Sequence, residues 1–274
     1  MATLQCPALV LRSVDFGESD RILHLLTPRT GRLTVIAKGA RRSVKRFPGT
    51  LDFFNLLHVQ VERRRPTSMA RLEHARLERT YLGLRTRPSR FALGCYILEL
   101  FDRLAPEGGA QQDHARLFEF ARTALGWADE REPDLKLRTL LELGALDVLG
   151  LRPELRSCVR CGMPVEKRAG RGGEIRFHIG DGGPICEDCT DATQQGLPVH
   201  VGTLLALDRS LRLDPESRSR VALGGAALAE ARQLLGRFLR FHVGLELRSE
   251  RFLDEQLLTL SGPEGRIRPP ATPG

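Results

Sequence analysis

Four of the six cysteines in this 274-residue chain form two Cys-x-x-Cys pairs, which is the spacing of a thiolate metal site. Cys158 pairs with Cys161 and Cys186 with Cys189, and 24 residues separate the two pairs. Two thiolates at this spacing bind one ion from a single turn, and two such turns complete a tetrahedron. Because four protein ligands leave no position open for water, the sequence predicts one structural Zn²⁺ rather than a catalytic ion.

Disulfide bonds are the alternative for these cysteines, and the expected compartment disfavours them. No apolar run approaches the roughly 20 residues that span a bilayer, and the first residues lack the plan of a secretion signal. We therefore expect a soluble cytoplasmic protein, associated with the nucleoid. His178 could replace a ligand, but with four cysteines available we expect it to be an ordinary surface side chain. Cys6 and Cys95 have no such spacing and are expected in the core.

A cluster of cations near the N-terminus is the second feature with chemical meaning. The net charge of +8 lies in the first 80 residues, which hold 15 Lys and Arg against 7 Asp and Glu, whereas residues 81–274 hold 27 of each. Two groups carry this excess: Lys38, Arg41, Arg42, Lys45 and Arg46, followed by Arg63, Arg64 and Arg65. Such density indicates a site for a polyanion, most often nucleic acid, and a surface that only aids solubility is the alternative.

Aromatic residues near these cations bear on how a single strand would bind, because bases stack on aromatic rings. Phe16, Phe47, Phe53 and Phe54 are the aromatic residues of the first 80 positions. Phe47 adjoins the basic loop and is expected to lie near DNA, whereas Phe53 and Phe54 are expected in the core. With so few rings, the affinity for nucleic acid should be mainly electrostatic.

The sequence offers little equipment for catalysis. Asp15-Phe16-Gly17 imitates the metal-binding tripeptide of kinases, but the glycine-rich loop and the catalytic loop of that class are missing. The P-loop, the dinucleotide fingerprint and the zinc-protease helix are also missing from the sequence. Glu130, Glu132 and Asp134 could hold Mg²⁺ for a nuclease, but beside Pro133 they are better explained as a solvated loop and a helix start. We therefore do not expect an enzyme.

The elements that must position the cations have the pattern of a small barrel. Five short segments are rich in β-compatible apolar residues and are separated by turn residues: 8–12, 21–26, 33–38, 56–61 and 68–72. In the third of them, apolar and polar residues alternate. Five strands over this length are typical of an OB-type β-barrel, whose exposed face and loops bind single strands. The sequence thus predicts an OB-fold nucleic-acid-binding domain at residues 1–80.

From about residue 74 the spacing of apolar residues changes to 3.6, which predicts helices. The expected helices cover 91–104, 117–125, 135–149, 226–243 and 249–258. We expect an α-helical domain at 81–154 and 197–260, interrupted by an inserted zinc-binding module at 155–196. Residues 261–274 are rich in Gly and Pro and are expected to be disordered. The predicted fold class is therefore α+β and multidomain.

Several sequence runs together form a recognisable signature: Ala8-Leu9-Val10-Leu11-Arg12, Gly17-Glu18-Ser19-Asp20-Arg21-Ile22-Leu23, Thr27, Gly31-Arg32-Leu33 and Ala37-Lys38-Gly39-Ala40-Arg41-Arg42. This signature resembles that of the bacterial RecO recombination mediators, a family of DNA repair proteins. The later layout is also similar to that family, since a helical body is interrupted by four cysteines and ends in the runs 238–244 and 247–249.

The resemblance to RecO implies an OB fold that binds single- and double-stranded DNA and anneals complementary strands. It also implies partnership with RecR and the single-strand binding protein SSB, with which RecA is loaded onto SSB-coated DNA. Because the sequence has no long apolar run, we expect no membrane partner. Some members of the family lack the cysteines, so the metal is not essential to the family's activity.

The resemblance further implies a site for the tail of SSB, which is acidic and ends in an apolar residue. Such a tail needs a basic rim around an apolar groove. Arg232, Arg237 and Arg240 on the expected helix 226–243 could form that rim, and a solvated face around core leucines is the alternative. Two other functional classes remain open: a zinc-stabilised OB-fold protein that binds RNA in ribosome assembly or translation, and a metal-dependent nuclease.

Overall fold

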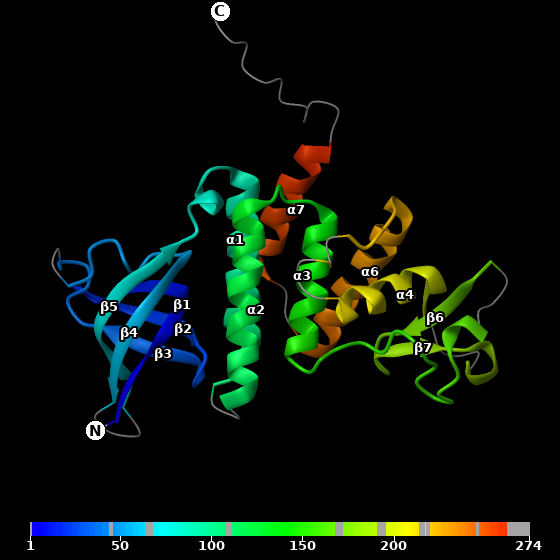
Figure 1. Cartoon of the computed structure of the whole chain (residues 1–274), viewed down its shortest axis with the longest axis horizontal. Coiled ribbons are helices and arrows are strands. Elements are labelled where there is room, and N and C mark those ends of the chain that lie inside the picture. The colour runs from blue at the N-terminus through cyan, green and yellow to red at the C-terminus, as the bar shows by residue number, and fades with distance from the viewer. Residues whose placement is uncertain are drawn as a thin grey trace, which may run out of the picture.

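The computed structural model of the chain describes residues 2–43, 46–63, 68–107, 111–167, 172–190, 196–213, 217, 220–244 and 247–261. Three parts lie in a row, with a β-barrel at one end, helices in the middle and a small β-sheet at the other end (Figure 1). The tail that the sequence predicts to be disordered lies outside the described residues, except for Ser261, which ends the last helix.

The barrel consists of β1 (Ala2–Phe16), β2 (Asp20–Thr27), β3 (Gly31–Ala37), β4 (Asn55–Arg63) and β5 (Ala70–Thr80). Its strand order is β1-β2-β3-β5-β4, and β4 pairs with β1, so the hydrogen-bonded sheet closes on itself. Neighbouring strands are antiparallel except for β3 and β5, which are parallel. The five strands predicted at the N-terminus are therefore present.

The alternation of side chains explains why these strands enclose a core of their own. Leu23 and Leu25 of β2 pack with Val35 of β3 and with Leu57 and Val59 of β4, and all five side chains are fully buried. Each such burial contributes about 1.5–3 kcal/mol. Because a slip of one residue would turn these side chains to the outer face, the alternation also fixes the register of the strands.

The last strand continues further than the sequence indicated. The helical region was expected from about residue 74, but β5 runs to Thr80 because it pairs with β4 as far as Asn55. Two register shifts interrupt this pair, and Leu77 of β5 points outward with 43% of its surface exposed. The apolar residues of β5 therefore depart from strict alternation, and this removed the strand signal from the sequence.

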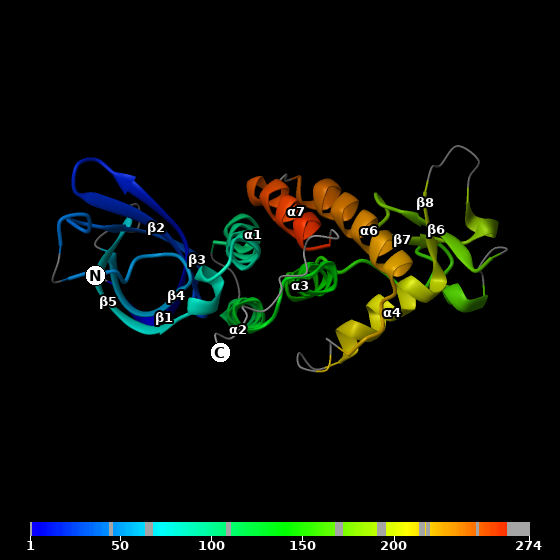
Figure 2. The same ribbon diagram turned by 90° about the horizontal axis from the view of Figure 1, so that it is seen from above.

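Helices form the middle of the described chain: α1 (Pro88–Leu104), α2 (Gln111–Glu130), α3 (Leu135–Val148), α4 (Val201–Arg212), α6 (Gly225–Val243) and α7 (Arg248–Ser261). The sequence predicted all of these except α4. α1 and α2 face the barrel, whereas α4 and α6 face the small sheet (Figure 2). Among the described helices, none has an apolar stretch long enough to cross a membrane.

The small sheet is made of β6 (Glu174–His178), β7 (Gly183–Ile185) and β8 (Leu197–His200), in the order β7-β6-β8. Because β8 pairs with β6 and leads directly into α4, the sheet continues past the expected module boundary at residue 196. Ile175 and Phe177 of β6 are buried in the core that the helices share. The small sheet therefore packs as part of the helical body.

Polar and apolar contacts join the barrel to the helices. His24 Nδ1 of β2 lies 2.5 Å from Asp102 Oδ1 of α1, and the Arg32 guanidinium of β3 donates to the backbone oxygen of Asp102 at 2.6 Å. Leu9 and Leu26 on the outer face of the barrel pack into the helical core. α1 therefore covers the stretch of β1 and β2 that contains these residues.

Candidate metal centre and nucleic-acid interface

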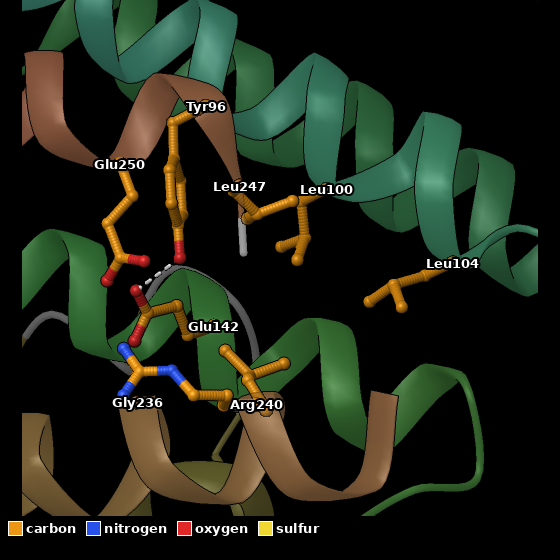
Figure 3. Close-up of a pocket in the computed structure, with 9 residues that line it drawn as sticks. Tyr96, Leu100, Leu104, Glu142, Gly236, Arg240, Leu247 and Glu250 are labelled. Carbon is orange, nitrogen blue, oxygen red and sulfur yellow. Dashed lines mark hydrogen bonds between the residues drawn. The ribbon is translucent and has the colours of Figure 1, made fainter. Parts of the chain in front are cut away.

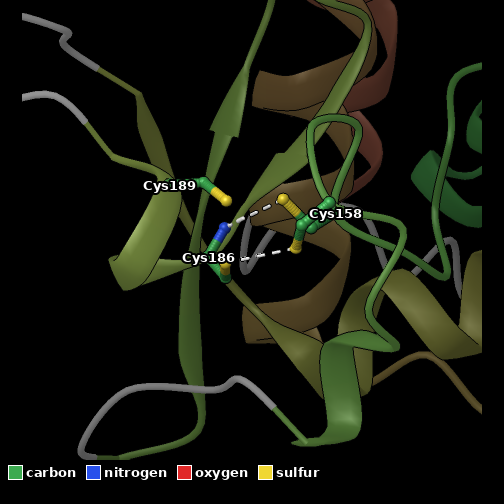
Figure 4. A group of neighbouring side chains, drawn as sticks. Cys158, Cys186 and Cys189 are labelled. Atoms are coloured by element: carbon green, nitrogen blue, oxygen red, sulfur yellow. Dashed lines mark hydrogen bonds between the residues drawn. The ribbon is translucent and has the colours of Figure 1, made fainter.

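The four predicted cysteine ligands come together beside the small sheet (Figure 4). Their Sγ atoms all lie within 4.8 Å of one another, and those of Cys161 and Cys186 are 3.7 Å apart. Zn–S bonds of about 2.3 Å in a tetrahedron place neighbouring sulfur atoms about 3.8 Å apart. The structure describes all six cysteines, and none of them forms a disulfide bond. The donor set and its spacing therefore fit one Zn²⁺.

Each cysteine pair lies on a tight turn that local hydrogen bonds hold in place. In the first turn the Gly162 amide donates to Cys158 O at 2.8 Å, and Gly162 has a φ of 73°, which glycine adopts without strain. In the second turn the Cys189 amide donates to Cys186 O at 3.0 Å. The guanidinium of Arg160 links the two turns by donating to Cys189 O at 2.8 Å. The ligands are thus held by the protein's own hydrogen bonds.

The surroundings of Cys158 favour its thiolate form. Burial would raise the pKa of this thiol, but hydrogen bonds from the amides of Cys186, Cys161 and Arg160 lower it to about 6. Hydrogen bonds with the neighbouring thiols raise the pKa of Cys189 to about 12. Because the thiolate is the form that binds metal, an ion must displace the protons that remain on the cluster.

Other candidate metal ligands have structural roles. His178 lies outside the cysteine cluster, and its Nδ1 accepts a hydrogen bond from the Asp181 amide at 3.1 Å. Asp134 begins α3, because its Oδ1 accepts from the Leu137 amide at 2.6 Å. Glu132 lies 2.8 Å and 3.1 Å from two arginines at the start of α1. These side chains do not form a second metal site within the described ranges.

The basic loop is paired with carboxylates of the β1–β2 hairpin. Three pairs join the two segments: Lys38 with Asp20 at 2.6 Å, Arg41 with Asp15 at 3.2 Å, and Arg42 with Glu18 at 3.4 Å. The Arg42 and Glu18 side chains are 71% and 91% exposed. Because exposed pairs contribute only about 0–1 kcal/mol, a phosphate can compete for these cations. These ion pairs could not be predicted from the cationic run alone, because the acids lie on the preceding hairpin.

Of the remaining predicted cations, the structure describes only Arg46 and Arg63. Lys45, Arg64 and Arg65 lie outside the described residues. Arg46 crosses to β5, where its guanidinium donates to Glu73 O at 3.1 Å. Arg63 is exposed at the end of β4 and lines a groove on the barrel that Arg32 and several hydroxyl side chains also line. The described cations therefore lie on the loop and along this groove.

Phe47 does not lie on the surface of the basic loop, which corrects the expectation that it contacts DNA. Its side chain is 5% exposed and packs with Leu51 into the core of the barrel. The guanidinium of Arg46 lies 5.1 Å from the centre of its ring. The loop after β3 therefore places the Phe47 ring in the core of the barrel. Burial of the ring lowers the free energy of the folded state, because it removes apolar surface from water.

The exposed aromatic side chains of the barrel are different ones. Phe16, at the end of β1, is 52% exposed. Phe53 was expected in the core but is 37% exposed, whereas Phe54 is buried as expected. The Phe54 ring packs edge-on against Phe91 of α1, with ring centres 5.5 Å apart. The position of a phenylalanine beside charges in the sequence therefore did not indicate which ring faces solvent.

The three arginines predicted for the SSB tail lie on α6 but in different surroundings. Arg232 lies 2.5 Å from Asp254 of α7, and Arg237 is exposed. Arg240 borders a pocket between α1 and α6 (Figure 3). The pocket is lined by apolar residues and two carboxylates: Tyr96, Leu100, Leu104, Leu239, Leu247, Glu142 and Glu250. The structure thus brings one of the three arginines to an apolar pocket.

Comparisons with known proteins cover nearly the whole chain. Residues 1–81 match the family model "Recombination protein O N terminal", and residues 85–251 match "Recombination protein O C terminal". A DNA repair protein RecO from Anaeromyxobacter dehalogenans (strain 2CP-C) is 37% identical over 255 residues, which cover 93% of this chain and 97% of the relative. One from Myxococcus xanthus (strain DK1622) is 35% identical over 246 residues, which cover 90% of this chain and 95% of the relative.

Proposed function

Because this chain belongs to the RecO family of DNA repair proteins, we propose that it is a recombination mediator that binds single- and double-stranded DNA and anneals complementary strands. Membership of the family gives it a role in DNA repair and recombination. In the proposed role it acts together with RecR to load RecA onto single strands coated with SSB, in a RecF-type pathway. The role requires binding and release of DNA and no bond-breaking chemistry.

The observation that carries this proposal is the N-terminal barrel with cations on one of its long connections. Five strands in the order β1-β2-β3-β5-β4, returning to β1, support the assignment of residues 1–80 to an OB-type domain. The connection between β3 and β4 carries Lys38, Arg41, Arg42 and Arg46. OB-type barrels bind nucleic acid with such loops and with the adjoining strand face.

Exchange of ion-pair partners explains how these cations would bind DNA. A phosphate that approaches the loop replaces the hairpin carboxylates, with which Arg41 and Arg42 form exposed pairs. Each phosphate contact adds about 0.9 to the slope of log affinity against log salt on duplex DNA and about 0.7 on a single strand. Contacts to phosphate are independent of sequence and leave the base edges free to pair. This combination suits a protein that anneals strands.

The four cysteines would hold Zn²⁺, with Cys158 and Cys161 on one turn and Cys186 and Cys189 on the other. The ion supplies a rigid cross-link between the two turns and no chemistry, because its four positions are filled. The adjoining β6–β7 turn contacts α6, where His242 Nε2 lies 2.7 Å from Ile179 O. We therefore assign the metal a structural role in bracing the small sheet against the helical body.

The pocket beside Arg240 is the site we propose for the tail of SSB. Its leucines provide an apolar floor for the last residue of the tail, and Arg240 provides positive charge beside it. Arg237 is exposed three residues earlier on the same helix and would add to this charge. Arg232 is engaged with Asp254 and would act by holding α7 beside the pocket. The alternative, a solvated face of α6, predicts that replacing Arg237 and Arg240 leaves the affinity for SSB unchanged.

Annealing of complementary strands coated with SSB tests the proposed function. A variant with Lys38, Arg41, Arg42, Lys45 and Arg46 replaced by Gln should anneal far more slowly than the wild type. A control variant loses the same charge from exposed arginines of the helical body: Arg103, Arg116, Arg209, Arg220 and Arg251. The control should anneal like the wild type. Equal loss in both variants would assign the effect to net charge rather than to the loop.

Competition between DNA and RNA of matched sequence tests the alternative of an RNA-binding protein. We expect DNA to compete at least as well as RNA for the barrel. A clear preference for RNA, together with failure of the wild type to anneal SSB-coated DNA, would replace the mediator proposal with the RNA-binding one. Incubation of DNA with the protein and Mg²⁺ or Mn²⁺ tests for a nuclease, and we expect the DNA to remain intact.

A further inference from the structure

The outer face of β1, β2 and β3 carries a row of apolar side chains that extends to the tip of the β1–β2 hairpin. Val14 of β1 lies directly opposite Ile22 of β2, and Ile22 lies opposite Ile36 of β3. Residues opposite each other in a sheet point to the same face, so these three side chains are neighbours. Val14 is 42% exposed, and the two isoleucines are partly exposed.

Phe16 continues this row at the end of β1. It lies two residues beyond Val14, so both side chains point to the same face of the strand. With 52% of its surface exposed, Phe16 is the most exposed aromatic side chain among the described residues of the barrel. The exposed ring at the end of this apolar row offers a flat surface. Burying that surface against a ligand would be favourable, because contact between apolar surface and water is unfavourable.

Cations border this face on two sides. Arg12 is exposed and lies two residues before Val14 on the same strand, beyond the register shift that separates it from Val10. Phe16 lies opposite Asp20, whose Oδ2 accepts a hydrogen bond from Lys38 Nζ at 2.6 Å. A ligand on Phe16 therefore lies near Lys38. This lysine binds a carboxylate in the structure and can bind a phosphate instead.

An apolar ring with cations around it matches a nucleotide whose base is free of pairing. The bases of a single strand can stack on Phe16 while their phosphates reach Lys38 and Arg12. In a duplex the flat faces of the bases are buried in the stack, so the same ring gains nothing from double-stranded DNA. A second copy of this chain could also cover the apolar row, and the oligomeric state of the variants distinguishes that occupant from DNA.

We propose that Phe16, together with the Val14–Ile22–Ile36 row, is a stacking platform for the bases of single-stranded DNA. The platform rests on the proposed function and deepens it, because it separates two modes of binding within one barrel. The basic loop binds phosphates of either form of DNA, whereas Phe16 contributes only when bases are unpaired. The platform also replaces Phe47, whose buried ring is closed to bases.

Binding of an oligothymidine strand and of a duplex of the same length, measured by fluorescence anisotropy, tests the platform. Phe16→Ala should weaken binding of the single strand by about 5- to 150-fold, the loss of one base–aromatic contact, and leave duplex binding unchanged. Phe16→Leu should behave like Phe16→Ala, because it keeps an apolar side chain without the ring. Phe252→Ala, which removes a 38% exposed ring from α7, is the matched control and should leave both affinities unchanged.

Phe16→Trp supplies a second, independent readout. The tryptophan should retain single-strand affinity, and its fluorescence should be quenched when oligothymidine binds and not when duplex binds. The native Trp127 is buried in the helical body and provides the constant background. Circular dichroism tests whether each variant folds, and sedimentation measures whether it keeps the wild-type mass.

Each result has a distinct meaning. Equal weakening of single-strand and duplex binding in Phe16→Ala, or no change in either, would overturn the platform while leaving the proposed function in place. A changed oligomeric state in Phe16→Ala with unchanged DNA binding would assign the face to a second copy of the chain. Failure of the wild type to bind either form of DNA would overturn the proposed function itself.

Discussion

Lys38 Nζ donates to Asp20 Oδ2 at 2.6 Å, and the amide of the next residue, Gly39, donates to the other oxygen of the same carboxylate at 2.8 Å. One carboxylate at the start of β2 therefore holds the first turn of the cationic loop after β3. The loop that we propose to bind DNA is positioned by an acid of the hairpin beside it. DNA binding and the order of the loop are thus linked through the same few charges.

The exposed acid Glu18 should act as a competitor of DNA. Its carboxylate lies 3.4 Å from the Arg42 guanidinium, and a phosphate must take its place. Glu18→Gln should therefore strengthen binding to duplex DNA several-fold at low salt and steepen the salt dependence by up to about 0.9. Anisotropy titrations over a range of salt concentrations measure both quantities.

Glu255→Gln is the matched control for Glu18→Gln. It removes the same charge from an exposed acid of α7, which lies 3.0 Å from Arg251 in the helical body. This control should change DNA binding much less than Glu18→Gln. If both variants bound DNA equally tightly, the net charge of the chain, and not competition at the loop, would explain the gain.

Asp20 should make the stability of the barrel depend on pH in the acid range. The hydrogen bonds from Lys38 and from the Gly39 amide lower the pKa of Asp20 from 3.8 to about 2. Since the folded state binds this proton more weakly than the unfolded state, the stabilisation is present above about pH 4 and is lost as the pH falls toward 2. Asp20→Asn should therefore be less stable than the wild type near neutral pH, and the difference should shrink on acidification.

Urea unfolding at a series of pH values measures this difference in stability. Asp52→Asn is a suitable control, because Asp52 is an exposed acid of the same barrel domain with a weaker partner. Its carboxylate lies 3.7 Å from the Arg21 guanidinium, whereas the two contacts of Asp20 described above are 2.6 Å and 2.8 Å long. We expect the control to show a smaller and flatter difference from the wild type. A difference for Asp20→Asn that stayed constant down to about pH 2 would contradict the assigned role of its carboxylate.

The strands of the barrel, most of the helices and the cysteine cluster could be predicted from patterns of neighbouring residues. The alternation at residues 33–38 identified a strand whose Val35 and Ala37 are buried in the barrel core, and the spacing of the four cysteines identified their cluster. Both patterns place their side chains by geometry that adjacent residues define. The apolar periods of the helices worked in the same way, and Asp134 marked the start of α3 as its cap.

Contacts between distant segments were the parts that the sequence did not predict. Phe47 stands beside Arg46 in the chain, yet the loop turns its ring into a core built from strands on both sides of the loop. The carboxylate partners of Arg41 and Arg42 come from the preceding hairpin. A count of charges along one run of sequence cannot include partners that only folding brings near, so the loop appeared more basic than it is.

Loss of one cysteine should abolish metal binding and loosen the small sheet. Cys186 is buried, and its amide lies 3.5 Å from Cys158 Sγ, so Cys186→Ser removes a ligand from the centre of the cluster. We expect the wild type to contain close to one zinc per chain by mass spectrometry of the metal, and Cys186→Ser to contain almost none. Thermal unfolding of the helical body should begin at a lower temperature in the variant.

Cys95→Ser provides the control for cysteine replacement, because Cys95 lies on α1 and outside the cluster. This variant should keep its zinc. DNA binding by the barrel should survive in Cys186→Ser, since the barrel has a core of its own. Full zinc content in Cys186→Ser would show that the four cysteines are not the ligands, and loss of DNA binding would show that the metal does more than brace the fold.

A buried arginine should be the most sensitive charged residue of the helical body. The Arg138 side chain of α3 is only 4% exposed and lies 2.7 Å from Glu142 and 2.8 Å from Glu250, with Asp254 as a third partner. The Tyr96 hydroxyl donates to the same Glu142 at 2.6 Å, so the network joins α1, α3 and α7. Removal of Arg138 leaves the 3% exposed carboxylate of Glu142 without its cation.

Arg138→Ala should therefore lower the free energy of unfolding by about 3–5 kcal/mol, the usual effect of breaking one side of a buried ion pair. Urea unfolding followed by far-UV circular dichroism measures this change. Arg251→Ala is the control, because Arg251 pairs with Glu255 on the surface of α7 with 90% of its side chain exposed, and we expect no measurable change. In the triple variant Arg138→Met, Glu142→Leu, Tyr96→Phe much of the stability should return, because neither a buried charge nor the buried hydroxyl that donates to Glu142 is then left without a partner. A triple variant as unstable as Arg138→Ala would mean that packing around the arginine, and not the unpaired carboxylate, explains the loss.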